Sequence, residues 1–307
     1  MALDSRKQGL RFSLATRKGV SMRRLGLALC ALFWMTSSSL WAQVKVELSL
    51  KQKRFLPHER IFVTVKLTNF TGRDLRFSPT SEWLRFYAES TSRKIVPKKS
   101  PVTVEADWVV KSSEVATIDL NVEPFYDFSS LDRYRLRASV WIEALRREFS
   151  SDEVTFHVFP GVKIWEQVFG MPPDPEKPEV APELRKYALI QYKRTDKPVL
   201  YFRLTNPEET KTFEVYPFGT SVSFSLPECL IDMRGRLHVL NQFDAKRFGY
   251  TEFTTAGKRA VHQTYVYADQ SRPRLTMDNG GKGIVIGGRR QFRATDYPRS
   301  QSVSTVN

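Results

Sequence analysis

Cysteine is scarce in this sequence of 307 residues, which holds only Cys30 and Cys229. Cys30 lies in an apolar stretch near the N-terminus that we expect to be removed from the mature protein. The mature chain would then keep one thiol and could form no intramolecular disulfide. A disulfide-stapled secreted scaffold is therefore excluded, and stability has to come from hydrophobic cores alone.

Histidine is also scarce, and its spacing argues against a metal site. The four histidines are His58, His157, His238 and His262. No two of them stand at the helical spacing of a zinc ligand pair or as a His-x-His pair on a strand. We expect no metal and no cofactor.

Signatures of catalysis are missing as well. No serine lies in a Gly-x-Ser-x-Gly elbow, and the glycine-rich run 280–288 lacks the Lys-Ser/Thr ending of a phosphate loop. The remaining alternative is a thiol nucleophile at Cys229, with His238 or His262 as its base. Apolar neighbours and nearby acids disfavour a thiolate at Cys229, so we interpret it as a buried structural residue. We predict that the protein is not an enzyme and has no catalytic residue.

Apolar runs long enough to span a membrane as a helix are not found. The run Leu25–Met35 has about half the required length, and a pair of arginines precedes it. These features predict a secretory signal peptide at Met22–Ala42, with a retained N-terminal anchor as the alternative. Residues 1–21 form an upstream extension, and we expect Met22 rather than Met1 to be the true start. The predicted location is the periplasm or the outside of a bacterial cell.

Short β-rich runs separated by turn residues fill the region after the signal peptide. The segments Val44–Leu50 and Ile61–Leu67 alternate apolar and polar residues, which indicates strands with one face in a core. About seven such strands in one segment are typical of a β-sandwich. The other candidates are Leu75–Phe77, Leu84–Ala88, Ala116–Leu120, Tyr134–Ile142 and Val154–Phe159.

The segment 131–138 resembles a tyrosine corner, in which a tyrosine hydroxyl bonds to nearby backbone at the edge of a sandwich. The alternation directs Tyr134 and its even-numbered neighbours inward. Arg133, Arg135 and Arg137 then point outward, and we interpret them as a solvated strand face.

A proline-rich, acidic segment separates this first domain from a second β-rich region. We expect a short helix at Lys163–Phe169 and an extended chain after it. A hairpin at 186–193 and 198–204 is favoured over a helix that begins at Pro182. The further candidate strands are Ser221–Ser225, Leu237–Leu240, Gly249–Phe253, Val261–Tyr267, Arg274–Met277 and Gly283–Ile286.

The sequence therefore predicts an all-β fold of two tandem immunoglobulin-like β-sandwich domains after an N-terminal signal peptide. The predicted divisions are 1–42 (signal peptide and upstream extension), 43–160 (first sandwich), 161–183 (Pro-rich linker with the short helix), 184–295 (second, basic sandwich) and 296–307 (disordered tail).

Charge is strongly positive, with a formal net charge of +15. Residues 184–307 hold 20 basic and 11 acidic side chains, so the second domain carries much of the excess. Its late basic cluster predicts an anion-binding face, since arginine forks suit carboxylates and phosphates. The alternative is that these charges keep strand edges from associating. The cluster consists of Arg272, Arg274, Arg289, Arg290 and Arg293, with Lys282 beside them.

The first domain resembles the bacterial β-sandwich family named for an intracellular proteinase inhibitor. The resemblance covers residues 45–158 and is carried by Phe55-Leu56-Pro57-His58-Glu59, Val63-x-Val65-x-Leu67-x-Asn69, Asp127-Phe128-Ser129 and Tyr134-x-Leu136-x-Ala138. It implies a sandwich and, by the family name, protease inhibition. The chain departs from the pattern because no reactive loop can be matched and an export signal precedes the domain.

The second domain is similar to parts of uncharacterised exported bacterial proteins, at Leu237–Gln242 and Arg272–Leu275. We therefore predict a non-enzymatic binding or scaffold protein of the bacterial envelope, whose partner is an anionic envelope polymer or another exported protein. The alternative is an inhibitor-like or chaperone-like partner of exported proteins. No nucleic acid is expected, because the compartment is wrong and no binding motif is present.

Overall fold

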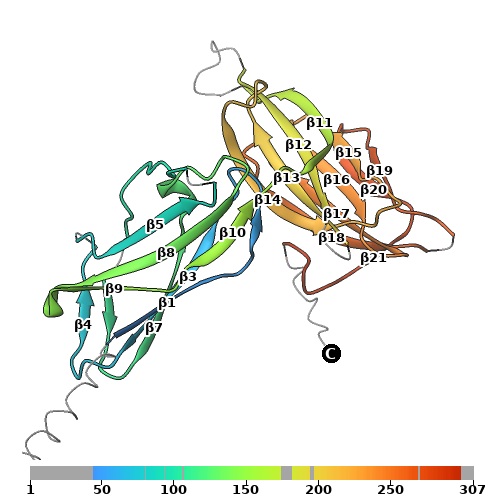
Figure 1. Cartoon of the computed structure of the whole chain (residues 1–307). Coiled ribbons are helices and arrows are strands. Elements are labelled where there is room, and N and C mark those ends of the chain that lie inside the picture. Colours follow the sequence, from blue (N-terminus) through green and yellow to red (C-terminus); the bar gives the residue numbers. More distant parts are fainter. Residues whose placement is uncertain are drawn as a thin grey trace, which may run out of the picture.

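The computed structural model describes residues 44–298, except 80, 93, 106, 174–181, 194–196 and 269. This part of the chain is all-β and contains no α-helix, only two short 3-10 helices at Glu123–Phe125 and Glu143–Leu145. Figure 1 shows two β-sandwich-like units, which we name the first unit (44–158) and the second unit (162–298). The predicted signal peptide and positions 299–307 of the predicted tail lie outside the described residues.

The first unit has two main sheets that enclose one core. Alternation places Val63, Val65 and Leu67 at 0% exposure, facing the buried side chains of the opposite sheet. The three-stranded sheet is β1 (Val44–Leu50), β3 (Phe62–Asn69) and β7 (Val115–Asn121). The other sheet runs β2 (Arg54–Phe55), β10 (Val154–Val158), β8 (Arg133–Ile142) and β5 (Leu84–Ser90), with β9 (Arg147–Ser150) also on β8. The short strands β4 (Leu75–Phe77) and β6 (Trp108–Val110) pair with each other.

The tyrosine corner is confirmed. Tyr134 is buried in the first core, and its hydroxyl donates to Ser130 O at 2.7 Å. Arg133, Arg135 and Arg137 are exposed on β8, as the alternation predicts. The ring therefore anchors the start of β8 while the arginines form a solvated face.

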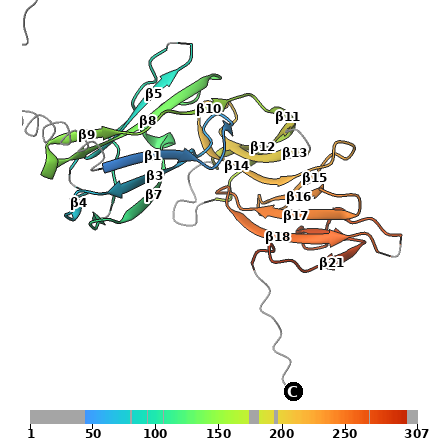
Figure 2. The ribbon, with the colours of Figure 1, turned by 60° about the horizontal axis from the view of Figure 1, so that its bottom comes forward.

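The second unit has three layers. A four-stranded sheet packs on a five-stranded sheet around Tyr187, Phe202 and Phe253, and Figure 2 shows the two sheets stacked. The first sheet is β11 (Val162–Gly170), β12 (Leu184–Lys193), β13 (Pro198–Thr205) and β14 (Thr212–Thr220). The second is β15 (Glu228–Ile231), β16 (Leu237–Gln242), β17 (Arg247–Phe253), β18 (Arg259–Val266) and β21 (Arg289–Gln291).

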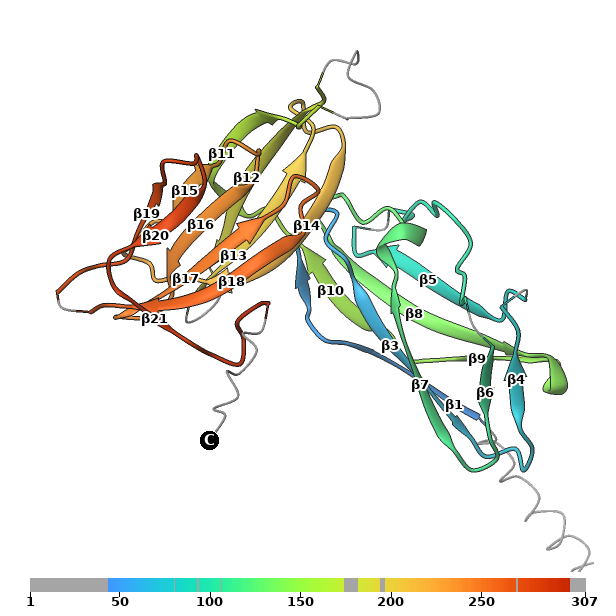
Figure 3. The same ribbon diagram turned by 180° about the vertical axis from the view of Figure 1, so that it is seen from behind.

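A hairpin of β19 (Arg274–Met277) and β20 (Gly283–Ile286) covers the outer face of the second sheet (Figure 3). Leu275 and Val285 of this hairpin pack against a small core that contains Leu240 and Phe248. Every residue of β16 is buried, because side chains on both faces of the strand are covered.

The helix predicted at Lys163–Phe169 is wrong, because these residues belong to strand β11. In the sequence, the apolar positions of this segment fit the period of a helix as well as that of a strand. A bulge between Lys163 and Trp165 breaks the strand alternation. Gly170 pairs with Leu184, so the proline-rich segment connects two antiparallel strands of the second unit. The predicted linker 161–183 is thus largely part of the second unit, and only residues 159–161 join the two units.

Two further expectations were wrong. Ser221–Ser225 is not a strand; the strand is β14, just before it, whose Pro217 is tolerated because β14 is an edge strand. The hairpin expected at 186–193 and 198–204 is confirmed, since β12 pairs antiparallel with β13, and its helical alternative from Pro182 is excluded by strand β12. The predicted disordered tail begins too early, since Asp296 is 4% exposed and Tyr297 pairs with His262.

The two units meet through a small shared core. Leu56 and Phe159 of the first unit and the connecting segment pack with Ile190, Tyr201 and Val215 of the second unit. The Phe159 ring lies 3.9 Å from that of Tyr192, centroid to centroid.

Gly161, in the connection between the units, is needed for this close approach. A Cβ atom there would lie 2.0 Å from Ile190 Cγ2. Nη2 of Arg60 donates to both carboxylate oxygens of Glu214, at 2.9 and 3.0 Å, and this ion pair adds a charged contact between the units.

Candidate functional site

The predicted basic cluster does not converge on one site. Arg272 and Arg274 share the carboxylate of Glu228, at 3.9 and 2.9 Å from Oε1. Arg272 also lies over the ring of Phe248. These two arginines are therefore already paired, by an acid more than forty positions earlier in the sequence.

The other members of the cluster lie at or near β21. Arg290 bonds to the buried Asp296 at 3.3 Å and lies over Phe292. Arg289 and Arg293 are exposed and form no ion pair within the described part of the chain. Lys282 lies in the turn between β19 and β20. An anion-binding face made by Arg272, Arg274, Arg289, Arg290 and Arg293 stays a prediction.

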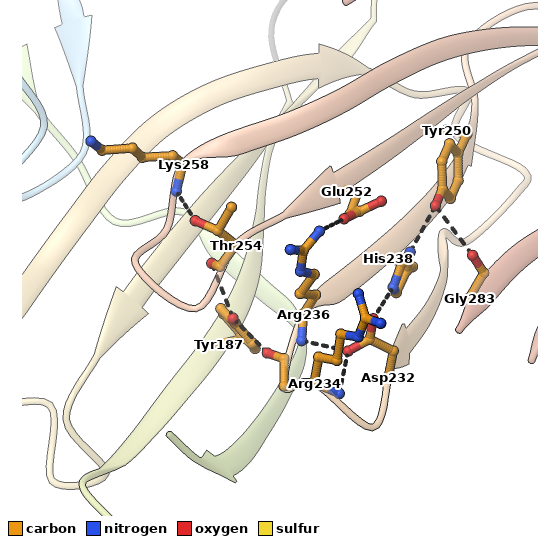
Figure 4. Close-up of polar contacts among 11 residues, drawn as sticks. Tyr187, Asp232, Arg234, Arg236, His238, Tyr250, Glu252, Thr254, Lys258 and Gly283 are labelled. Carbon is orange, nitrogen blue, oxygen red and sulfur yellow. Dashed lines mark hydrogen bonds and ion pairs between the residues drawn. The ribbon is translucent and has the colours of Figure 1, made fainter. Parts of the chain in front are cut away.

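A buried polar network ties the β15–β16 turn to the rest of the second unit (Figure 4). Tyr250 Oη lies 2.7 Å from His238 Nδ1, and Asp232 Oδ2 lies 3.1 Å from His238 Nε2. Asp232 also accepts from the backbone N–H groups of Arg234 and Arg236. Burial opposes ionisation of Asp232, but these donors outweigh it and lower the pKa of its carboxyl.

Asp232, His238 and Tyr250 are connected in sequence as in a proton relay, but the network is closed to solvent. His238 is 0% exposed, and the hairpin crosses it so closely that a Cβ on Gly283 would lie 2.5 Å from its ring. Burial also raises the pKa of the Cys229 thiol to about 12, so the thiolate form is disfavoured. This arrangement satisfies buried polar groups and fixes a turn, and it offers no accessible nucleophile.

A cleft between the two units has the features of a binding site. It has a volume of about 770 Å3, within the range of ligand pockets. Its first wall is the 51–62 segment of the first unit, and its second wall is β14 with the β17–β18 turn. The exposed aromatic rings Phe62 and Tyr297 line it, at 45% and 56% exposure.

Cationic side chains stand around this cleft. Lys51 is paired with Asp119, and Arg60 is paired with Glu214. Lys258 is exposed and forms no ion pair among the described residues. Arg259 Nε is buried and has no hydrogen-bond partner within the described chain, although Nη2 reaches Phe218 O at 3.4 Å. The exposed ammonium group of Lys258 is thus free to bind an anion, whereas the unpartnered Nε of Arg259 is itself buried.

The β17–β18 turn places these two cations at the cleft. Lys258 N–H donates to Thr254 Oγ1 at 3.1 Å, as Figure 4 shows. Gly257 has φ +81, a conformation that favours glycine, and its carbonyl accepts from Tyr216 Oη at 2.7 Å. The turn is therefore held firmly against β14.

Glu59 lies at the cleft and carries an unusual carboxyl group. It is 2% exposed and accepts from Leu56 N–H and Gln52 Nε2, both at 2.8 Å. Burial raises its pKa to about 7, and the two hydrogen bonds act in the opposite direction. Its charge therefore changes near neutral pH. Sequence reasoning singled out neither Glu59 nor Lys258 as a site residue, because only the packing of the units brings them together.

No group of His, Cys, Asp and Glu that could hold a metal ion occurs among the described residues. The described part of the chain also lacks a helix long and apolar enough to cross a membrane.

Comparison with known proteins gives little. No protein family and no curated protein matches the sequence. Among solved structures, the sporulation control protein Spo0M from Bacillus subtilis is similar over 58% of this chain and 89% of its own, with 9% identity and a TM-score of 0.26. This likeness is too low to support an argument about function.

Proposed function

We propose that this chain is a non-enzymatic binding protein of the bacterial envelope that holds an anionic polysaccharide in the cleft between its two units. The exported location rests on the predicted signal peptide Met22–Ala42. We also propose that each unit is an immunoglobulin-like domain, and that the first unit belongs with the proteinase-inhibitor-type sandwiches it resembles. The proposal differs from the sequence prediction in its site, which moves from the late arginine cluster to the cleft.

The observation that carries the proposal is the combination of unfilled cationic donors and exposed aromatic rings in one cleft. Lys258 and Arg259 supply charge, and Phe62 and Tyr297 supply flat apolar surfaces. Acidic sugars present both a carboxylate and an apolar ring face, so they fit such a surface. The shared core between the units keeps the walls in place, which lowers the entropy cost of binding.

The test is binding of polygalacturonate, with neutral dextran as the control polymer, measured by isothermal titration at low and high salt. We expect binding of polygalacturonate that weakens with salt, and none of dextran. Lys258→Glu should weaken binding about tenfold, because it reverses a charge beside the ligand.

Two matched variants separate the possible sites. Lys282→Glu makes the same charge change on the β19–β20 hairpin and should leave affinity unchanged. Arg289→Glu with Arg293→Glu alters the unpaired members of the predicted cluster. If this double variant abolishes binding while Lys258→Glu does not, the cleft is the wrong site and the basic face is the right one.

A further inference from the structure

We infer that one end of the second unit docks on an anionic lipid bilayer, into which the loop 221–227 inserts two apolar side chains. This loop leads from β14 to β15, so it joins the two sheets of the unit. The docking end lies where β17 begins, whereas the cleft lies beyond the end of β17, at the turn that carries Lys258. The inference therefore concerns a surface separate from the cleft and does not rest on the proposed function.

The loop 221–227 holds two of the most exposed apolar side chains among the described residues. Phe224 is 75% exposed and Leu226 is 73% exposed. Ser225, between them, is partly buried and accepts a hydrogen bond from Arg272 Nη2 at 3.2 Å. The two apolar side chains thus project into solvent from a loop that is itself fixed to the protein.

The β19–β20 hairpin lies beside this loop and adds to the apolar surface. Glu228, where β15 begins, accepts from Leu275 N–H of the hairpin at 2.8 Å. Leu275 and its cross-strand partner Val285 face the small core. The next pair, Arg274 and Ile286, therefore faces outward, and Ile286 is 50% exposed.

Two arginines lie at the base of the loop. Arg272 and Arg274 share one carboxylate, that of Glu228, at 3.9 and 2.9 Å from Oε1. One acid cannot neutralise both arginines, so one positive charge is left over. The side chain of Arg274 is 61% exposed, and a guanidinium group has five N–H donors, so it can bind a phosphate while it keeps its ion pair.

Two further cations lie at the same end of the second unit. Arg289 begins β21 and pairs with Val266, the last residue of β18. The N–H of Tyr267, the next residue, donates to Lys246 O at 3.1 Å. Arg289 and Lys246 are exposed and form no ion pair within the described chain. They are thus free to bind anions.

A lipid bilayer suits this combination of charge and projecting apolar groups. Asp244, the other described acid at this end, is paired with Arg247, so the described residues leave an excess of three positive charges. Anionic headgroups attract these cations, and the hydrocarbon beneath the headgroups can receive Phe224 and Leu226. Side chains that project need a soft or concave acceptor, and a bilayer is soft wherever the protein touches it. Charge and apolar insertion together supply the two signals that stable membrane binding requires.

The position of this end in the molecule leaves it open to a membrane. Figures 1 and 3 show the β18–β19 connection, which borders the docking end, on the side of the second unit that faces away from the first unit. The first unit therefore does not cover the docking end.

The test is co-sedimentation of the chain from residue 43 onward with lipid vesicles. This expected mature form lacks the apolar run 25–35, which would bind vesicles by itself. One set of vesicles holds equal parts of phosphatidylglycerol and phosphatidylcholine, and the control set holds phosphatidylcholine alone. We expect binding to the anionic vesicles that weakens at high salt, and none to the neutral ones.

Two pairs of variants separate apolar insertion from charge, and the first pair concerns the loop. Phe224→Ser with Leu226→Ser should weaken binding to the anionic vesicles at least about tenfold, because two side chains no longer enter the hydrocarbon. Phe70→Ser with Ile95→Ser removes two exposed apolar side chains from the first unit and should leave binding unchanged.

The second pair concerns the cations. Lys246→Ala with Arg289→Ala should weaken binding and reduce its salt dependence, because two charges are lost at the membrane surface. Lys94→Ala with Lys98→Ala is an equal loss of charge at exposed positions of the first unit and should change neither.

A fluorescent reporter measures insertion directly. Phe224→Trp places an indole at the tip of the loop, and brominated phosphatidylglycerol should quench it when the protein binds. Phe70→Trp, a 58% exposed position of the first unit, should show no more quenching than the native chain.

The inference is wrong if the protein binds both kinds of vesicle equally or neither kind, and the absence of vesicle binding would point to a protein partner for the loop. It is also wrong if Phe224→Ser with Leu226→Ser melts as the native chain does and binds vesicles equally well. Binding without quenching of Phe224→Trp would reduce the docking end to a charged patch into which no side chain inserts.

Discussion

At the scale of single residues, the carboxyl group of Glu59 has a pKa far above its ordinary value. Burial raises its pKa from 4.5 to about 7, so the folded protein binds its proton more tightly than the unfolded chain. The stabilisation is complete below pH 4.5, is lost as the pH rises to about 7, and stays lost above that. The shift corresponds to roughly 3 kcal/mol in the free energy of unfolding.

Glu59→Gln tests this dependence, because glutamine keeps the shape and cannot ionise. We expect the stability of the variant to vary less with pH between about 4.5 and 7 than that of the native chain. Urea denaturation at several pH values measures the difference. Glu105→Gln, at an exposed position, is the control. A native-like fall in stability across this range in Glu59→Gln would show that another group is responsible.

The same charge bears on the proposed ligand. An ionised Glu59 in the cleft repels an anion, whereas the protonated form does not. We therefore expect polygalacturonate to bind more weakly at pH 8 than at pH 6, and Glu59→Gln to reduce this difference. Titration calorimetry of both proteins at the two pH values checks it. A pH dependence that is the same in both would place its origin outside Glu59.

At the scale of elements, the close crossing of the β19–β20 hairpin over β16 depends on glycine. A Cβ on Gly283 would lie 2.5 Å from the His238 ring, so Gly283→Ala should destabilise the second unit by about 1–3 kcal/mol. In a His238→Ala background the space is free, and the same change should cost less. Chemical denaturation of the four proteins gives the coupling between the two positions. Equal costs in both backgrounds would mean that the hairpin relaxes away from the ring.

The elements differ in how well the sequence predicts them. The alternating residues of β1 and β3 identify these strands, because one face of each is in a core and the other is in solvent. β11 is missed because its bulge interrupts that alternation, and β14 is missed because its proline usually marks a break. The strands Arg274–Met277 and Gly283–Ile286 are predicted correctly, and Asp278 accepts from Gly280 N–H in the tight turn between them.

The candidate sites are harder to predict than the strands. Lys258 and Phe62 lie almost two hundred positions apart in the sequence, and only the docking of the two units places them in one cleft. Conversely, the arginines of the predicted basic cluster are close in sequence, but their ion pairs with Glu228 and Asp296 keep them apart. Local sequence therefore shows which charges exist, whereas tertiary packing decides which of them are free.

At the scale of the whole molecule, the contact between the units decides whether the cleft is a fixed site. Units joined by a flexible linker would move independently, and their facing walls would have no constant spacing. Here the connection is three residues long, from 159 to 161, and the units share an apolar core and the Arg60–Glu214 ion pair. We expect the two units to unfold together.

Phe159→Ala tests this coupling, because Phe159 is 6% exposed and packs on Tyr192 across the boundary. Its loss should cost about 3 kcal/mol and, since the missing contacts join the units, should divide one calorimetric transition into two. Phe70→Ala removes a 58% exposed ring from the first unit and should leave a single transition. Two transitions in the native chain would show that the units are already independent. The cleft would then have to form when its ligand binds, and the affinity for polygalacturonate would fall by the cost of bringing the walls together.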